Sequence, residues 1–247
     1  MQKILGLLRK AVQQYDLIQD GDRIAVAVSG GKDSLVLLKA LSEYRRFSPA
    51  KYDLTAITID PRFNDTDGDY SAVKSLCDAL GIPFVIEPTD IAKIVFDIRK
   101  EQNPCSLCAK LRRGALHGCA KSHGCSKLAL GHNNDDVIET FLMNLFQTGS
   151  ISCFAPKSYL PDRDITVIRP LCLVPEKQVI SAAKRHSLPI VTSSCPADKH
   201  TKRQETKEWL NSMERSDKGF KLRIFGAMCR ANVSGWGISR NNETETG

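Results

Sequence analysis

The stretch Ile24-Ala25-Val26-Ala27-Val28-Ser29-Gly30-Gly31-Lys32-Asp33-Ser34 decides the fold class of this chain of 247 residues. Its first five residues form an apolar run typical of a buried strand, and the apolar spacing that follows Ser34 is helical. The order of strand, glycine turn and helix start would aim free backbone N–H groups at one point. Such a helix N-terminus attracts anions, because free amides and the helix macrodipole both favour negative charge. An ordinary glycine-rich turn between a strand and a helix is the simpler alternative.

The turn does not have the Walker pattern, because Lys32 precedes an aspartate and no Gly-x-x-x-x-Gly-Lys-Ser/Thr string is present. It resembles the Ser-Gly-Gly-x-Asp-Ser loop of the N-type ATP pyrophosphatases, the PP-loop family, which split ATP into AMP and pyrophosphate. The resemblance implies that the loop holds the phosphates of ATP through Ser29, Gly30, Gly31, Asp33 and Ser34. Lys32 is included in this site, although the family pattern leaves its position free either to face solvent or to add charge.

Strand-like and helix-like segments alternate along the chain. We expect strands at 24–28, 54–59, 83–87, 127–130 and 165–169, and helices at 35–44, 70–80, 107–120, 136–146 and 176–186. This alternation predicts an α/β fold with a doubly wound, mostly parallel sheet and ligands at the carboxyl ends of the strands. The resemblance implies the adenine nucleotide alpha hydrolase-like variant of that fold.

The chain divides into three predicted parts. A PP-loop ATP-binding domain with a Cys-x-x-Cys insertion is expected at 1–194, a basic helical C-terminal extension at 195–238 and a disordered tail at 239–247. Residues 1–16 have the spacing of an amphipathic helix, and residues 149–164 have the composition of a surface loop.

Composition limits the location and the chemistry. No apolar run approaches the roughly 18 residues of a membrane span, and the N-terminus does not have the continuous apolar core of a signal peptide. We therefore expect a cytoplasmic protein with no membrane partner. The nine cysteines are not expected to form disulfides, since the cytoplasm keeps thiols reduced. Metal binding, sulfur chemistry and burial remain as their functions.

The net charge of +7 is concentrated in two segments. Residues 102–134 contain five Lys or Arg and no acidic residue, and residues 199–230 contain nine Lys or Arg against four Asp or Glu. Basic segments are usually solvated faces, so charge alone indicates nucleic-acid binding only weakly. The position of the first segment beside a cysteine motif strengthens that indication.

The cysteine motif is Pro104-Cys105-Ser106-Leu107-Cys108-Ala109-Lys110-Leu111-Arg112-Arg113-Gly114. Two thiolates separated by two residues can bind zinc or an iron–sulfur cluster, form a redox pair, or simply be buried. Together with the loop upstream, the string resembles the signature of the tRNA 2-thiocytidine biosynthesis proteins, the TtcA family.

Three further segments carry the same resemblance, which covers roughly residues 20–215. They are Gly131-His132-Asn133-Asn134-Asp135-Asp136-Val137-Ile138-Glu139-Thr140, then Val167-Ile168-Arg169-Pro170-Leu171, and Cys195 followed by Arg203. The resemblance implies a [4Fe-4S] cluster with one open iron, held by Cys105, Cys108 and Cys195. The rival is a zinc ion held by Cys105, Cys108, Cys119 and Cys125, with His117 or His123 as a substitute ligand.

Several polar residues follow strand ends and are expected to border the nucleotide. Asp60 and Gly131 are assigned to the ATP site, and Asp136 to ATP and magnesium, since Mg²⁺ bound to a triphosphate needs only one or two carboxylates. Asp60 could instead form a turn before Pro61, and Asp33 could instead cap the helix. Asp135 and Glu139, four residues apart, could simply share an exposed helix face.

By resemblance, the activity is ATP-dependent thiolation of a cytidine base in the anticodon loop of tRNA. Asp33, Cys105, Cys108 and Cys195 are the expected catalytic residues. RNA phosphates are expected along the surface that joins Arg112 and Arg113 to Lys202 and Arg203, on elements other than the loop. A sulfur donor such as a cysteine desulfurase is implied, and a homodimer is one assembly open to the chain. The alternatives are a PP-loop ATP-dependent amidase or ligase, and a zinc-stabilised nucleotide-binding module.

Overall fold

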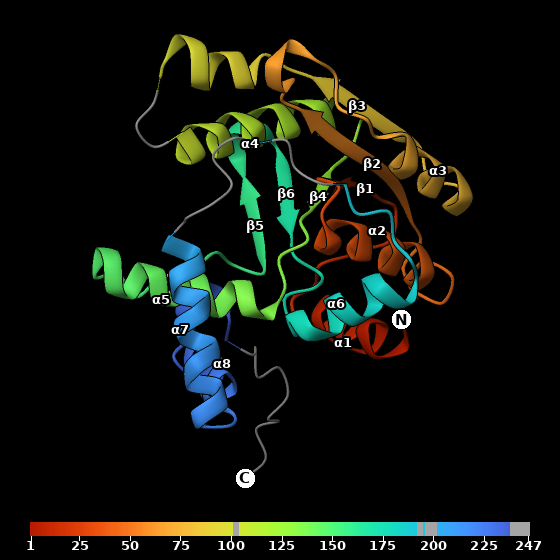
Figure 1. Ribbon diagram of the computed structural model, residues 1–247. Helices are drawn as coiled ribbons and strands as arrows, with labels where there is room; N and C mark the ends of the chain where they lie inside the picture. Colours follow the sequence, from red (N-terminus) through yellow and green to blue (C-terminus); the bar gives the residue numbers. More distant parts are fainter. Residues whose placement is uncertain (101–103, 192–194, 196–201, 238–247) are drawn as a thin grey trace.

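The computed structural model describes residues 1–100, 104–191, 195 and 202–237. In this part of the chain, six strands form one sheet in the order β3-β2-β1-β4-β6-β5 (Figure 1). Five strands are mutually parallel: β1 (Asp22–Ala27), β2 (Tyr52–Asp60), β3 (Phe84–Pro88), β4 (Lys127–Ala129) and β6 (Ile165–Ile168). The predicted doubly wound, mostly parallel sheet is therefore confirmed.

The sixth strand, β5 (Lys157–Leu160), lies inside the segment predicted to be a surface loop. It pairs antiparallel with β6, so that Lys157 lies opposite Ile168 and Leu160 lies opposite Ile165. The 3-10 turn η3 (Pro161–Arg163) joins the two strands, and Asp164 closes the turn with a φ of 45°. The loop prediction was wrong here, because a four-residue strand followed by proline has too little period-2 pattern to be distinguished from a loop.

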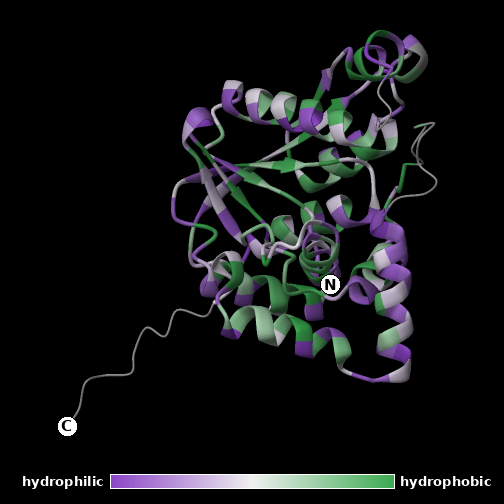
Figure 2. Cartoon of the chain, turned by 90° about the vertical axis from the view of Figure 1, so that its left-hand side faces the viewer, coloured by the Kyte–Doolittle hydropathy of each residue, from purple (hydrophilic) through white to green (hydrophobic). Residues whose placement is uncertain are grey.

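The helices cover the two faces of the sheet unequally. One face carries α1 (Gln2–Gln14), α2 (Lys32–Tyr44), α3 (Ser71–Leu80) and α6 (Glu176–Arg185), which form the main core with the strands. The other face carries α4 (Pro104–Ser122), which packs through Cys119 and Ala120 on a smaller core. The central strands appear largely green in Figure 2, as expected for strands covered on both faces.

The chain reverses direction across the sheet at β1. From β1 it proceeds to β2 and β3 through α2 and α3, and it then returns through the π-helical turn η2 (Lys93–Ile98) and α4 to β4 on the other side of β1. The strand order therefore reverses at β1, which pairs with β2 on one side and β4 on the other. Ligands of doubly wound sheets bind at such a reversal point.

The C-terminal helices α7 (Lys202–Ser216) and α8 (Phe220–Arg230) pack against α5 (Asn134–Thr148). Leu210 of α7 is fully buried against Ile138 and Leu142 of α5. Beyond α8 and the short turn η4 (Val233–Gly235), the Trp236 side chain is fully buried in the main core, and its Nε1–H donates to the Phe154 carbonyl at 2.9 Å. The described C-terminal region is thus helical and shares the main core.

Two predictions about the ends of the chain fall at or beyond these limits. The proposed domain boundary at residues 194 and 195 stays a prediction, and the predicted disordered tail at 239–247 lies outside the described residues.

A short 3-10 turn, η1 (Phe63–Asp65), follows β2. Within the described ranges, no helix has the length and apolarity needed to cross a membrane.

Candidate active site at the carboxyl edge of the sheet

The predicted phosphate loop folds back on its own serines. The Ser34 hydroxyl accepts the Ser29 N–H at 3.2 Å and donates to the Gly31 carbonyl at 2.9 Å, while the Ser29 hydroxyl accepts the Gly31 N–H at 3.3 Å. Helix α2 begins immediately after Gly31, and no side chain caps it. The alternative in which Asp33 caps the helix is therefore wrong. The first N–H groups of α2 have no side-chain cap, as an anion site requires.

Gly30 is required by its backbone and its surroundings. Its φ is +80°, and a Cβ at this position would lie 2.8 Å from the Cβ of Val191. The Val191 N–H also donates to the Gly30 carbonyl at 3.0 Å, which fixes the chain after α6 against the loop. A side chain at position 30 would thus be strained and would displace this contact.

The Gly-His-Asn segment lies directly against the phosphate loop, although the two are 100 residues apart in sequence. A Cβ on Gly131 would lie 3.0 Å from the carbonyl carbon of Asp33 and 3.1 Å from the Ser34 nitrogen. The Asn133 amide donates to Asp33 Oδ1 at 2.9 Å. Gly131 therefore lets β4 approach the start of α2, and Asn133 holds the Asp33 carboxylate in place.

Lys32 lies in an ion-pair network that the sequence did not predict. Its Nζ is 2.7 Å from Asp33 Oδ2 and 3.0 Å from Glu176 Oε1, and Lys207 of α7 approaches the same Glu176 oxygen at 2.6 Å. Burial opposes the charge of Lys32, but the hydrogen bonds to Asp33 and Glu176 outweigh it and raise its pKa. The Lys32 ammonium is thus paired with Asp33 and Glu176, and its assignment to the ATP site stays a prediction.

Asp136 has both carboxylate oxygens engaged. Oδ2 accepts the Asn133 N–H at 2.9 Å in a capping box, and Oδ1 accepts Arg203 Nη1 at 3.0 Å. Burial raises the pKa of Asp136, although the hydrogen bond from Asn133 and the Arg203 charge act against that rise. Each oxygen keeps a second lone pair beside these contacts, and the assignment of Asp136 to magnesium stays a prediction.

Two further carboxylates of α5 are buried or half-buried, so the alternative of an exposed helix face is wrong. Asp135 pairs with Lys221 of α8 at 2.6 Å and accepts the Glu176 N–H at 2.7 Å. Glu139 is only 3% exposed, and burial together with the neighbouring Asp136 raises its pKa to about 7. Together with the Arg203–Asp136 pair, these contacts attach the C-terminal helices to the edge of the site.

Asp60 lies at the end of β2 and is almost fully buried. Its carboxylate accepts the N–H groups of Arg62 at 3.0 Å and Gly68 at 2.8 Å. These contacts are those of the turn-forming alternative. The assignment of Asp60 to the adenosine site stays a prediction.

The first two predicted cluster ligands lie on the first turns of α4, which begins at Pro104. Cys105 is exposed and Cys108 half-buried, and their spacing places them on one face of the helix. Burial raises the pKa of Cys108, the Cys195 and Cys105 thiols add to the rise, and Arg112 opposes it. The structure thus brings Cys195 within electrostatic reach of Cys108, across 87 residues of sequence. None of the nine cysteines, all within the described ranges, forms a disulfide.

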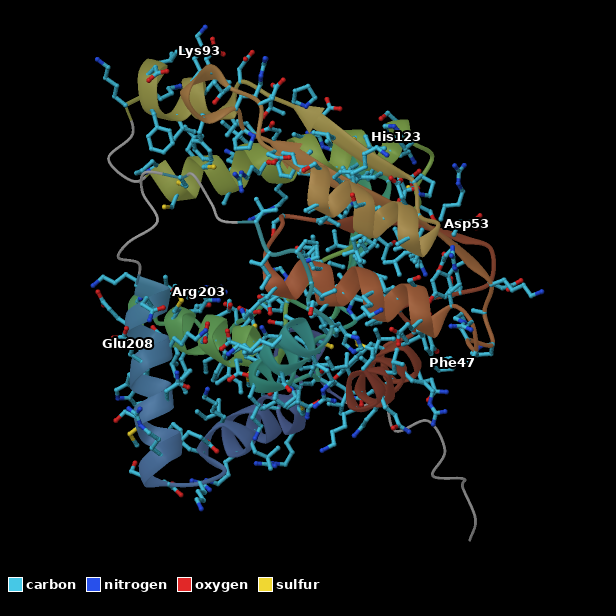
Figure 3. The ribbon with its side chains drawn as sticks, turned by 45° about the vertical axis from the view of Figure 1, so that its right-hand side comes forward. Phe47, Asp53, Lys93, His123, Arg203 and Glu208 are labelled. Atoms are coloured by element: carbon cyan, nitrogen blue, oxygen red, sulfur yellow. The ribbon has the colours of Figure 1, made fainter. Side chains whose placement is uncertain are left out.

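The rival zinc site does not form. Cys108 and Cys119 are eleven residues apart on the same helix, which at about 1.5 Å per residue separates them by about 16 Å. Cys119 and Cys125 are buried in the smaller core, near His123, which Figure 3 shows at the end of α4. Within the residues that the structure describes, no group of three His, Cys, Asp or Glu side chains could hold a single metal ion. A cubane cluster spaces its cysteine sulfurs more widely than one ion does, so this result does not exclude the cluster.

A cavity of about 600 Å³ joins the loop to α4. Its apolar wall comes from β1, β2 and β4, and Ser29 lies at its edge. Four arginines line it, namely Arg112, Arg113, Arg169 and Arg203. Figure 3 shows Arg203 at the end of α7 that faces this region. A volume of this size is in the usual range for ligand pockets, about 300–1,000 Å³.

The predicted RNA-binding residues have different surroundings. Arg112, Arg113 and Arg203 line the same cavity as Ser29, and their assignment to RNA stays a prediction. Lys202 differs from them, because it is exposed and pairs with Glu205 at 3.1 Å. The inward position of Arg112 had a sequence signal, since Cys108, Arg112 and Leu116 follow one another at four-residue intervals on one helix face.

A Ser-Gly-Gly-x-Asp-Ser turn at the reversal point of a doubly wound sheet defines a PP-loop nucleotide-binding protein. A comparison with protein families matches residues 3–214 to the PP-loop domain, and the chain belongs to that family. Within it, the chain is 41% identical over 94% of its length to a protein of Geobacter metallireducens, covering 90% of that protein. It is 39% identical over 92% of its length to one of Citrifermentans bemidjiense, covering 89% of it. Both are named tRNA-cytidine(32) 2-sulfurtransferase, and the chain belongs to the same TtcA family.

Among solved structures, the chain is similar to the U34-tRNA thiolase NcsA from Methanococcus maripaludis with its [4Fe-4S] cluster. The TM-score is 0.72 and the sequence identity is 27%, over 92% of this chain and 77% of NcsA. This match agrees with the fold.

Proposed function

We propose that this protein is an ATP-dependent tRNA sulfurtransferase that converts a cytidine of tRNA into 2-thiocytidine. The observation that carries the proposal is the single cavity that connects the phosphate loop at Ser29 to the helix that bears Cys105, Cys108 and Arg112. The relatives named tRNA-cytidine(32) 2-sulfurtransferase support tRNA as the substrate and position 32 as the target.

The first step is activation of the base oxygen by ATP. The O2 atom of cytosine attacks the α-phosphorus, the bond between the α-phosphorus and the bridging oxygen breaks, and pyrophosphate leaves. Ser29, Ser34 and the free N–H groups at the start of α2 would hold the phosphates, and Lys32 adds positive charge beside them. Fixed donors of this kind stabilise the charge that moves onto the leaving group, which is the main protein contribution to phosphoryl transfer.

The second step is the replacement of oxygen by sulfur. A sulfur nucleophile attacks C2 of the adenylated base, the C2–O bond breaks, and AMP leaves with the oxygen. Soft thiolate ligands suit an iron–sulfur cluster, and Cys105, Cys108 and Cys195 would hold it. When bound, the cluster supplies the sulfur at its open iron. The helix spacing of the first two thiols and the electrostatic contact of Cys195 with Cys108 fit this group.

The two alternatives receive less support. A PP-loop amidase or ligase has no use for the Cys105 and Cys108 pair on the helix that lines the cavity. The zinc-stabilised module depended on ligands that α4 holds about 16 Å apart.

Further parts of the proposal concern the cellular setting. A cysteine desulfurase is the proposed sulfur donor, a homodimer is the proposed assembly, and the cytoplasm is the proposed compartment because tRNA is modified there. Mg²⁺ is proposed to enter with ATP.

The experiment separates the two steps. Protein purified without oxygen is mixed with ATP and a tRNA that carries cytidine at position 32, and the released pyrophosphate is measured with and without added sulfide. The proposal expects tRNA-dependent pyrophosphate release in both cases and 2-thiocytidine only with a sulfur source. Pyrophosphate release that does not depend on tRNA would contradict it.

A further inference from the structure

One part of the cavity has no role in the proposed phosphate or cluster sites. We call it the Phe154 pocket and define it by His132, Phe154 and Arg169, which all line the cavity. The His132 ring lies 4.8 Å from the Phe154 ring, centroid to centroid, at an interplanar angle of 30°. The Arg169 guanidinium carbon lies 4.7 Å from the centroid of Phe154. The pocket thus has an aromatic face, and a guanidinium group is packed on it.

The pocket contains polar atoms that lack partners. Five buried side-chain nitrogen or oxygen atoms in the described chain have no hydrogen-bond partner, and three of them belong to cavity-lining residues: Arg112 Nε, His132 Nδ1 and Arg169 Nε. Native proteins rarely leave buried polar atoms in this state, and each exception requires an explanation. A ligand with polar atoms, bound in the cavity, would give these three atoms hydrogen-bond partners after small side-chain rotations. Such a ligand explains why all three border one cavity.

The charged groups of the cavity determine what that ligand can present. Every charged residue among the described lining residues is an arginine, so guanidinium donors face the space and no carboxylate acceptor does. The imidazole of His132 is neutral at physiological pH, because burial, aided by Arg169, Arg203 and Arg113, lowers its pKa to about 3. A ligand edge composed of acceptors is therefore favoured over one that carries an N–H.

Arg169 is fixed in a way that leaves part of its donor fork unused. Its Nη1 donates to the Ala155 carbonyl at 2.6 Å, which orients the guanidinium plane. The Nε–H has no partner among the described residues, and it lies on the edge that the guanidinium shares with Nη2. Cytosine presents O2 and N3 as adjacent acceptors, and these match a pair of parallel donors. Uracil carries a hydrogen on N3, which would oppose one of them.

We propose that the Phe154 pocket receives the target base and that Arg169 selects cytosine over uracil through O2 and N3. The inference rests on the proposed function, since it names the subsite for that substrate. Phe154 holds Arg169 and His132 at the border of the space that the base enters, because both groups pack against its ring. An unpaired loop base can present its edge to such a pocket. The O2 atom has two lone pairs, so it can accept a hydrogen bond from Arg169 and still attack the α-phosphorus with the other.

The test compares two anticodon stem-loop RNAs that differ only in carrying cytidine or uridine at position 32. Binding to the full chain in the presence of a non-hydrolysable ATP analogue, and pyrophosphate release with ATP, are measured for wild type and Arg169→Lys. The variant keeps the positive charge and loses the planar fork. Its affinity and rate for the cytidine RNA should fall by about 10- to 100-fold, the usual effect of losing a bidentate base contact. Both values for the uridine RNA and the KM for ATP should stay within about twofold.

Arg163→Lys is the matched control, because Arg163 is exposed on the turn between β5 and β6 and does not line the cavity. It should leave all values unchanged. Phe154→Leu gives a second test, because it removes the ring on which the Arg169 guanidinium packs. It should lower the preference for the cytidine RNA over the uridine RNA. A wild-type preference in folded Phe154→Leu would overturn the role of this ring in holding Arg169.

The outcomes also separate this inference from the proposed function. Arg169→Lys could weaken binding of both RNAs equally, or raise the KM for ATP and keep the preference for cytidine over uridine. Either result would overturn the base-reading role and indicate a phosphate contact. If the wild type acts on the cytidine RNA and Arg169→Lys keeps the same preference for cytidine over uridine, only this inference is refuted. A wild-type protein that releases no pyrophosphate with the cytidine RNA would instead refute the proposed function.

Discussion

Replacing Gly131 with alanine tests whether β4 and the phosphate loop are held in direct contact. The added Cβ would lie 3.0 Å from the Asp33 carbonyl carbon, 3.1 Å from the Ser34 nitrogen and 3.2 Å from the Asp33 oxygen. These are backbone atoms of the first turn of α2, and the Ser34 and Asn133 side chains hold that turn. The contact therefore cannot be relieved by moving a flexible side chain. Overpacking of this kind costs about 1–3 kcal/mol.

The matched control is Gly118→Ala, which makes the same chemical change in the interior of α4, where a Cβ would have no atom within 4 Å. Alanine there should stabilise the helix by about 0.5–1 kcal/mol. For a chain of this size, about 1 kcal/mol shifts the Tm by about 2–4 °C. Thermal unfolding should therefore show a lower Tm for Gly131→Ala and a higher one for Gly118→Ala.

The same two variants should differ in nucleotide binding. Displacement of Asp33 and Ser34 by a few tenths of an ångström should weaken ATP binding in Gly131→Ala, as measured by calorimetry, and Gly118→Ala should bind as wild type does. A Gly131→Ala protein with wild-type Tm and wild-type ATP affinity would refute the argument that the two motifs form one rigid site.

Three further predictions follow from the site. The double variant Ser29→Ala, Asp33→Ala should lose about 100-fold or more of pyrophosphate release in a coupled assay and keep the cluster absorbance, because the phosphate loop and the thiols lie on different elements; loss of the cluster in the folded variant would contradict this. Single alanine substitutions at Cys105, Cys108 or Cys195 should each abolish the visible absorbance of the cluster, whereas those at Cys119 and Cys125 should not; a coloured Cys195→Ala protein would reassign the third ligand. Glu139→Gln should flatten the pH dependence of stability, measured by urea unfolding at pH 5 and pH 8. The raised pKa of about 7 means that the folded state holds a proton which the unfolded chain loses above about 4.5, so wild-type stability should fall as pH rises through this window. Equal slopes for the two proteins would argue against that pKa.

The features predicted correctly from the sequence depend on local pattern. The strand–turn–helix order around Ser29 and the alternation of elements established the sheet, because each element has its own periodicity. The short strand β5 was missed since four residues before Pro161 do not form a recognisable period.

The features that were missed depend on contacts between distant segments. Glu176 accepts hydrogen bonds from both Lys32 and Lys207, and Arg203 pairs with Asp136, yet nothing local to these residues distinguishes them from solvated charges. The place of Arg112 in the cavity was not predicted either, because the side that a helix turns toward the sheet depends on the sheet beneath it. Charged residues are usually exposed, and the half-buried Arg112 lines the cavity instead.

The most direct measurement of the central claim is nucleoside mass spectrometry on tRNA incubated with the anaerobically purified protein, ATP and a sulfide source. Wild type should yield 2-thiocytidine at position 32 together with equal amounts of AMP and pyrophosphate, and Cys108→Ala should yield none, while Cys119→Ala should match wild type. Unmodified cytidine in the wild-type reaction, or 2-thiocytidine formed equally well by Cys108→Ala, would contradict the assignment of this protein as a cluster-dependent tRNA sulfurtransferase.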